Sequence, residues 1–324
     1  MKNKRAVKKS AYALTVLLTV TVIASLIGIA FANPMPAPPI LTIYIKSDGT
    51  IDPPNVPIQR TGNVYTFTGD IKNATIQIQR NNIILDGAGY ILRGNGQFWN
   101  TAINLTNTNN AIIENLQITN YVYSFYLTNS SNITILKNGI NTTWNIMIES
   151  SSNNQIIGNN ITGQNKGAGY GIQLKNASSN LIVANNVKDT GSAIKIALSK
   201  NNTFCYNNFL EMTEYGNDVV GYIEEENLES WSDGKRGNYW SNYNGIDSNF
   251  DGVGDTPFVI DEKRQDPYPL MVPYNITNLN DIDIQMPEIE QDQNHTTIIT
   301  VAATLTAAIT IGVLLMIYYK KHHP

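Results

Sequence analysis

The chain has 324 residues, with 26 Asp or Glu against 22 Lys or Arg, and its formal net charge is −4. Seven of the basic residues lie in two short end segments, which leaves 15 basic groups against 26 acidic ones in the body and argues against nucleic acid or anionic lipid as its partner. A single cysteine, Cys205, excludes an intrachain disulfide, and its place beside Phe204 predicts a packing residue.

Residues 1–32 have the features of an export signal. Basic residues within 1–10 precede an apolar run from Ala11 to Phe31, which ends in the small residues of a cleavage site, Ala30-Phe31-Ala32. We predict cleavage after Ala32. Because the apolar run is long enough to span a bilayer, an uncleaved anchor is the alternative.

Residues 33–80 are predicted to be a spacer and an N-terminal cap. A Pro-rich stretch at 33–39 leads into strand-like runs such as LTIYI and VYTFTGDI, which turn signals separate. A solenoid needs its open end covered against edge-to-edge pairing, and this segment is placed to cover it.

Residues 81–222 carry a repeat that predicts the fold. A block close to Asn-x-Ile-x-x-Asn-x-Ile recurs mostly every 22 residues, starting at Asn110, Asn154, Asn180 and Asn202, with looser copies near Asn82 and Asn132. An apolar pair recurs in step at Ile103/Leu105, Phe125/Leu127, Ile146/Ile148, Ile172/Leu174 and Ile194/Ile196. Two half-buried strands per repeat predict an all-β, right-handed, single-stranded parallel β-helix with coils of ~22 residues.

The repeated asparagines are predicted to be structural. Asparagine tolerates left-handed backbone geometry at corners, and equivalent Asn side chains on successive coils can hydrogen-bond as ladders.

The same repeat places Asp86, Glu114 and Lys137 on one ladder position. Coils about 4.8 Å apart would bring Asp86 and Glu114 near the ~5 Å carboxylate spacing of a retaining glycosidase. The alternative is an ordinary charge ladder that Lys137 neutralises, like the pair Glu149 and Lys175.

Two coils carry insertions at one predicted corner, Arg93–Asn100 and Gly163–Gly169. Because loops of a solenoid often gather on its binding face, the candidate ligand-binding residues are Phe98, Trp99, Lys166 and Tyr170. Three aromatic residues, Tyr123, Trp144 and Tyr170, lie two residues before an apolar pair. That parity favours an internal stack of rings, and stacking on sugars is the alternative.

Residues 223–274 form a predicted C-terminal module with an Asp/Gly-rich loop. Oxygen donors alternate as at the start of an EF-hand loop, at Asp247, Asn249, Asp251, Val253 (by its carbonyl) and Asp255. We therefore predict a weak calcium site, because position twelve is Phe258 rather than Glu; Asp261 and Asp266 are candidates for the missing ligand. A metal-free turn is the alternative.

Residues 275–296 are predicted to be an acidic stalk, 297–319 a transmembrane helix and 320–324 a cytoplasmic tail. The body would then be extracellular and held at the cell membrane by a single span. Ten candidate N-glycosylation sequons lie outside the span, at Asn73, Asn104, Asn129, Asn132, Asn141, Asn160, Asn176, Asn201, Asn275 and Asn294.

The coils resemble the right-handed β-helix repeats of NosD-like proteins, also described as domains of carbohydrate-binding proteins and sugar hydrolases. The segments Gly237–Tyr243 and Asp266–Met271, with the Asp/Gly loop between them, are similar to the ending of NosD-type domains in archaeal surface proteins, and IYIKSDGTIDPPNVPIQR is similar to their N-terminal cap. The resemblance implies periplasmic copper binding. The histidines, at 295, 322 and 323, and one cysteine argue against copper in the coils.

The expected function is therefore a binding or structural role at the cell surface, toward an envelope polysaccharide or a surface protein. The alternatives are a polysaccharide hydrolase or lyase that uses Asp86 and Glu114, and a copper-binding maturation protein.

Overall fold

The computed structural model describes residues 40–96, 99–165, 168–210, 220–224, 229–280, 282 and 284–289. By its contacts the chain divides into two units, 1–39 and 40–324, and all described residues belong to the second. The predicted export signal, membrane span and cytoplasmic tail lie outside the described residues. Among the residues described, no helix is long and apolar enough to cross a membrane.

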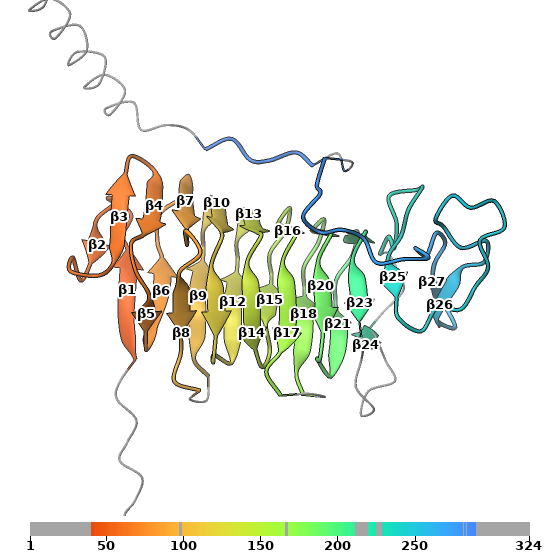
Figure 1. The fold of residues 1–324 in the computed structure, drawn as a ribbon. Coiled ribbons are helices and arrows are strands. Elements are labelled where there is room, and N and C mark those ends of the chain that lie inside the picture. Colours follow the sequence, from red (N-terminus) through yellow and green to blue (C-terminus); the bar gives the residue numbers. More distant parts are fainter. Residues whose placement is uncertain are drawn as a thin grey trace, which may run out of the picture. The chain divides into compact units, whose positions relative to one another are not determined.

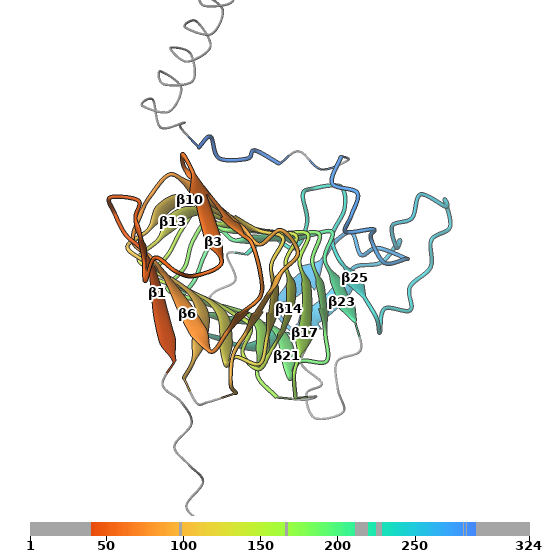
Figure 2. The same ribbon diagram turned by 60° about the vertical axis from the view of Figure 1, so that its left-hand side comes forward.

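Three parallel sheets, A, B and C, make up most of the described chain, and Figure 2 shows them as separate walls around a common core. Sheet A has the order β2 (Ile51–Asp52), β1 (Leu41–Ile45), β6 (Ala74–Ile78), β9 (Thr101–Thr106), β12 (Tyr123–Thr128), β15 (Ile146–Glu149), β18 (Tyr170–Lys175), β21 (Ser192–Ala197) and β24 (Val220–Glu224). Sheet B has the order β3 (Ile58–Thr61), β4 (Val64–Phe67), β7 (Ile83–Asp86), β10 (Asn109–Glu114), β13 (Ser131–Leu136), β16 (Gln155–Ile157), β19 (Leu181–Val183) and β22 (Thr203–Cys205). Sheet C has the order β5 (Ile71–Lys72), β8 (Ile91–Arg93), β11 (Gln117–Thr119), β14 (Gly139–Thr142), β17 (Asn160–Gly163), β20 (Asn186–Lys188), β23 (Asn208–Leu210) and β25 (Tyr239–Trp240).

From β4 to β24 the chain visits the sheets in turn, and strands pair in parallel with their equivalents one coil later (Figure 1), whereas β1 with β2 and β3 with β4 form antiparallel pairs. This confirms the parallel β-solenoid. Each coil has three strands rather than the predicted two. The two sequence signals mark sheets B and A, whereas strands of sheet C are mostly three or four residues long and bury one large apolar side chain each, such as Ile118 or Ile161. An alternation that short leaves no readable pattern.

The core consists of stacked inward-facing side chains. In sheet A the predicted apolar pairs lie in register from coil to coil, so that Ile103, Phe125 and Ile146 stack, and all are fully buried. Burying one such side chain is worth about 1.5–3 kcal/mol, so the repeat accounts for most of the fold's hydrophobic stabilisation.

Asparagines hold the corners in left-handed conformation, as predicted. Asn110, Asn132 and Asn153 have φ of 57°, 56° and 56° and occupy equivalent positions on successive coils. The register of β10 with β13 aligns Asn110 with Asn132, not with the buried Asn154, so the predicted repeat block at Asn110 is one residue out of phase.

Other asparagines form buried ladders between coils, which confirms their structural role. In the first ladder each Nδ2 donates to the Oδ1 of the next rung over 2.9–3.1 Å, through Asn138, Asn159, Asn185, Asn207 and Asn238. A second ladder joins Asn154, Asn180 and Asn202. Each ladder ends on a carboxylate: Asp266 ends the first ladder and Glu229 the second. A carboxylate accepts the hydrogen bond of the last Asn and, unlike another Asn, brings no donor that would need a further acceptor.

The C-terminal module closes the last coil with aromatic rings. Trp231 stacks on Phe204 at 4.6 Å, Trp240 packs on Phe209 at 4.6 Å, and Phe258 stacks on Trp240 at 4.4 Å between ring centroids. Phe258 belongs to the antiparallel hairpin of β26 (Phe258–Asp261) and β27 (Arg264–Asp266). The hairpin thus delivers Asp266 to the end of the first asparagine ladder.

The described chain after the module, residues 274–280, 282 and 284–289, is here called the strap. The sequence predicts a stalk from 275, but the strap runs back along the outer side of sheet B toward β10 (Figure 1). Tyr274, Leu279, Ile282 and Ile284 pack on an outer apolar row made of Leu136, Ile157, Val183, Ala184, Cys205 and Tyr206. Cys205 is therefore a packing residue, as predicted, and burial raises the pKa of its thiol to about 12.

Candidate functional site

Three aromatic rings form a row across successive coils where sheet C leads into sheet A. Tyr123 and Trp144 meet edge to face at 5.9 Å, and Trp144 meets Tyr170 in the same way at 5.9 Å. Lys195 extends the row, with its Nζ 4.7 Å from the centre of the Tyr170 ring. The row therefore joins side chains from four coils.

The predicted internal stack is right only in part: Tyr123 is 8% exposed, but all three rings lie outside the buried core cluster, and Trp144 and Tyr170 are half-buried. The alternation of inward and outward residues is interrupted here, because a small or polar residue directly before each apolar pair also faces inward. The inward-facing residues are Ala102, Ser124, Asn145, Gly171 and Ala193. The hydroxyl of Ser124 donates to the Asn145 carbonyl over 2.7 Å, and a Cβ on Gly171 would collide with the Ala193 carbonyl oxygen. Two consecutive inward residues turn the preceding ring outward.

The two inserted loops share this corner, as predicted, because one joins β8 to β9 and the other joins β17 to β18. Trp99 in the first loop is 76% exposed. The next residue, Asn100, accepts hydrogen bonds from the backbone of Val122 (2.7 Å) and Tyr123 (3.1 Å), which places Trp99 beside the row. Phe98 and Lys166 lie outside the described residues. We call Trp99, Tyr123, Trp144, Tyr170 and Lys195 the aromatic corner.

Polar groups on the outer face of sheet A adjoin the aromatic corner. Lys175 and Glu149 are register partners and pair at 2.7 Å, as predicted, and the Tyr126 hydroxyl donates to the same carboxylate at 2.7 Å. Lys175 lowers the pKa of Glu149, and burial raises that of Tyr126 to about 12. In the strand of Tyr170, Gln173 is 5% exposed and its Nε2 has no hydrogen-bond partner. Sequence reasoning missed Tyr126, Gln173 and Lys195, because outward positions of a strand carry no periodic signal.

The carboxylates Asp86 and Glu114 are direct register partners on β7 and β10, as predicted. Burial and the neighbouring Asp86 charge raise the pKa of Glu114. Asp86 accepts hydrogen bonds from the Ala88 backbone (2.8 Å) and from Asn115 Nδ2 (3.1 Å). Lys137 is not on their ladder position, because Leu136 is the register partner of Glu114 and Lys137 occupies a left-handed corner position with φ of 53°.

The Asp/Gly loop forms a compact turn held by its own carboxylates. Asp247 accepts from the backbone of Asp251 (3.2 Å) and Gly252 (2.9 Å), and Asp255 accepts from the backbone of Ser248 (3.0 Å). Val253 donates its N–H to Asp251, whose other carboxylate oxygen accepts from Asn249. Over the described part of the chain, no three His, Cys, Asp or Glu side chains are grouped to hold a metal ion.

The two candidates for the missing calcium ligand have other partners. Asp266 is fully buried and accepts from Asn238, Trp240 and Tyr268, and Asp261 pairs with Arg264. Neither is free to complete the loop.

Most candidate glycosylation asparagines are exposed at corners or on outer strand positions. The exposed ones are Asn129, Asn132, Asn141, Asn160, Asn176, Asn201 and Asn275, whereas Asn73 and Asn104 are half-buried and Asn294 lies outside the described residues.

The chain is similar to one protein family and, distantly, to a solved structure. The family described as "Periplasmic copper-binding protein (NosD)" matches residues 45–245, more than half of the chain. A solved structure of a candidate glycosyl hydrolase from Parabacteroides merdae is similar at 12% identity and a TM-score of 0.22, over 55% of this chain and 81% of that one. No curated protein matches the chain.

The described residues include one cysteine and no histidine as donors for a copper site. Copper prefers thiolate, thioether and imidazole ligands, and Cys205 is a buried thiol whose raised pKa, about 12, opposes the thiolate form. The three histidines lie outside the described residues. What the structure describes therefore does not fit copper, and no function is derived through that metal.

Proposed function

The chain belongs to the NosD family, and from that premise we propose that it is an extracellular, membrane-anchored β-helix protein that binds envelope glycans through the aromatic corner. The β-helix is the scaffold. The family, whose description is periplasmic, supports an extracellular body. The anchor rests on the apolar run at 297–319 and its basic flank.

The observation that carries the binding role is the row formed by the half-buried rings of Trp144 and Tyr170 with the buried ring of Tyr123, beside the exposed Trp99. Aromatic rings supply apolar faces against which the C–H groups of sugars can pack, and exposed aromatic clusters mark binding sites more often than scattered ones do. The adjoining groups Glu149 and Lys175 can bond sugar hydroxyls.

A glycan screen followed by titration tests the proposal. The full-length chain is kept in a detergent without a sugar headgroup, and the best oligosaccharide is titrated by calorimetry. We expect Trp99→Ala and Trp144→Ala each to weaken binding about tenfold, or about 1.4 kcal/mol. Tyr44→Ala, an exposed ring of β1 away from the corner, is the control. Equal affinity in all three variants would exclude the corner.

A polysaccharide-active enzyme is the second candidate, because Asp86 and Glu114 are register partners and the pKa of Glu114 is raised. Two neighbouring carboxylates, one of them with a raised pKa, are the arrangement that retaining glycosidases use. Product release from an envelope polysaccharide that Asp86→Asn abolishes would establish this activity in place of binding alone.

We also propose that the Asp/Gly loop binds Ca²⁺, with Asp247, Asn249, Asp251, Val253 and Asp255 as ligands once the carboxylates exchange their loop N–H partners for the ion. With a Kd near 10⁻⁴ M, 1 mM Ca²⁺ would stabilise the fold by about 1.4 kcal/mol. Excess chelator is then expected to lower the melting temperature by about 2–4 °C, and Asp251→Ala to remove that response. A melting temperature that neither excess chelator nor Asp251→Ala changes would contradict a calcium site.

A further inference from the structure

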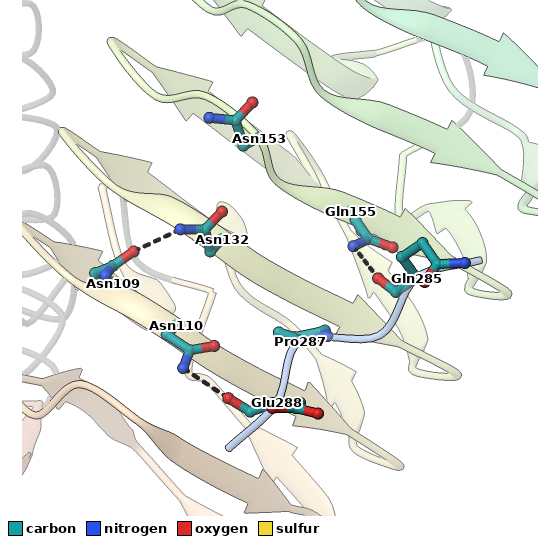
Figure 3. A pocket seen from close by; sticks show the side chains of 8 residues that line it. All are labelled: Asn109, Asn110, Asn132, Asn153, Gln155, Gln285, Pro287 and Glu288. Carbon is teal, nitrogen blue, oxygen red and sulfur yellow. Dashed lines mark hydrogen bonds between the residues drawn. The ribbon is translucent and has the colours of Figure 1, made fainter. Parts of the chain in front are cut away.

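A polar groove of about 370 Å³ lies between the strap and the corner that leads into sheet B (Figure 3). The strap forms one wall with residues 285–288. The opposite wall consists of amide side chains from three coils: Asn109, Asn110, Asn132, Asn153 and Gln155. We call it the amide groove. It lies on sheet B, whereas the aromatic corner joins sheets C and A.

The left-handed backbone explains only part of this amide lining. Asn110, Asn132 and Asn153 have φ near 56°, a conformation that glycine adopts at less cost, as Gly158 does at another corner. Asn109 and Gln155 do not have positive φ. An unbroken row of amides therefore exceeds what the corner geometry requires.

Two amides hold the strap by its backbone. Gln155 Nε2 donates to the Gln285 carbonyl over 2.8 Å, and Asn110 Nδ2 donates to the Glu288 carbonyl over 3.0 Å. A carbonyl oxygen only accepts, so the amide nitrogen of Gln155 must face the strap. Its Oε1 is then left buried without a hydrogen-bond partner. A buried acceptor left unpaired costs about 1–3 kcal/mol, so a donor at this position would be stabilising.

We propose that the amide groove binds a neutral saccharide unit, at a site separate from the aromatic corner. Amide side chains carry both donors and acceptors, which matches hydroxyl groups, and none of the groove-lining residues is Lys or Arg to attract an anion. Asn110 Nδ2 already donates to Asn82 and Glu288, and Asn109 Oδ1 accepts from Ser131 and Asn132. The remaining groups of Asn132, Asn153 and Gln155 are therefore the ones that would meet a ligand. The volume falls at the small end of ligand pockets, which suits one or two sugar rings. A sugar hydroxyl would donate to Gln155 Oε1 after the side chain turns this buried atom toward the groove.

The saccharide has two possible sources, because Asn132 both lines the groove and begins a sequon. Protein from a host without N-glycosylation is compared with protein that carries a glycan on Asn132, verified by peptide mass. If the unglycosylated protein binds the probe and the protein with a glycan on Asn132 does not, the chain's own saccharide is the occupant. Binding in both preparations identifies an external one.

The probes are methyl α-mannoside, methyl β-galactoside and N-acetylglucosamine, followed by saturation-transfer NMR and titration on the unglycosylated full-length chain. We expect millimolar binding of at least one probe, weakened at least tenfold in Gln155→Met. Asn132→Gly, which accepts positive φ and leaves both strap bonds intact, is expected to weaken it several-fold. Circular dichroism verifies the fold of each variant.

Trp144→Ala separates this proposal from the proposed function, because it should leave probe binding in the groove unchanged. Probe binding that Trp144→Ala removes and the two groove variants retain belongs to the aromatic corner and overturns the groove. Absence of binding by all three probes at 20-fold above the expected millimolar range overturns it as well.

Discussion

Replacing Asp266 by alanine is expected to lower the free energy of unfolding by about 3–5 kcal/mol. One oxygen of this buried carboxylate accepts from the Asn238 backbone (2.6 Å), Asn238 Nδ2 (3.3 Å) and Trp240 Nε1 (2.9 Å), and the other accepts from the Tyr268 backbone (3.0 Å). Burial raises the pKa of Asp266, and these donors offset the cost of its charge. Alanine would leave the backbone N–H of Asn238, Trp240 Nε1 and the backbone N–H of Tyr268 without this acceptor, whereas Asn238 Nδ2 keeps the carbonyls of Phe204 and Trp231.

The variant Asp266→Asn separates lost acceptors from lost charge. An amide oxygen can keep the three bonds to Asn238 and Trp240, while its NH₂ would face the Tyr268 N–H. We therefore expect less than half of the alanine effect in denaturant titrations. Glu262→Ala, exposed in the same hairpin, is the control and should stay within about 0.5 kcal/mol. An Asp266→Ala midpoint equal to that of the control would contradict the role of Asp266.

Breaking the first asparagine ladder at its middle rung should cost at least as much. In Asn185→Leu, the backbone N–H and Nδ2 of Asn159 both lose their acceptor, the Asn185 Oδ1 at 2.9 Å. The Ile156 carbonyl and Asn207 Oδ1 lose a donor. Asn159 Nδ2 keeps the Ile135 carbonyl, and Asn207 Oδ1 keeps the backbone N–H of residue 185. Five buried hydrogen bonds are lost, and at about 1 kcal/mol each we expect a loss of about 4–5 kcal/mol.

Gln117→Ala provides the comparison, because it removes an exposed amide from sheet C at no cost to the ladder. The measurement is the denaturation midpoint at constant slope. Similar midpoints for the two variants would mean that leucine packs in the ladder without penalty, and the ladder would then not specify the coil stacking.

Much of the fold could be predicted from sequence because side chains repeat at the coil spacing. The apolar pairs around Ile103 and Phe125 predicted the strands of sheet A, and the repeated asparagines predicted the ladders. The third sheet could not be read, since strands such as Gln117–Thr119 bury a single residue. The ending motif has a physical reason that only the structure shows: a Cβ on Gly237 would collide with the Asp266 carboxylate.

The site was less predictable because the local backbone breaks the alternation of inward and outward side chains along the strands. The inward Ser124 and Asn145 turn Tyr123 and Trp144 outward, and nothing in the alternation indicates that shift. The acidic segment after residue 274 predicted a stalk, since its apolar residues Leu279, Ile282 and Ile284 are few. Their partners, such as Val183, lie far away in sequence.

Hydrogen exchange with and without the best-binding oligosaccharide tests the central claim most directly, because it locates the bound glycan on the β-helix. The account predicts slower exchange at the backbone around Trp99, Tyr123, Trp144 and Tyr170, with sheet B around Asp86 and Glu114 unchanged. Slower exchange confined to sheet B, or no change at the aromatic corner while the oligosaccharide is bound, would contradict it.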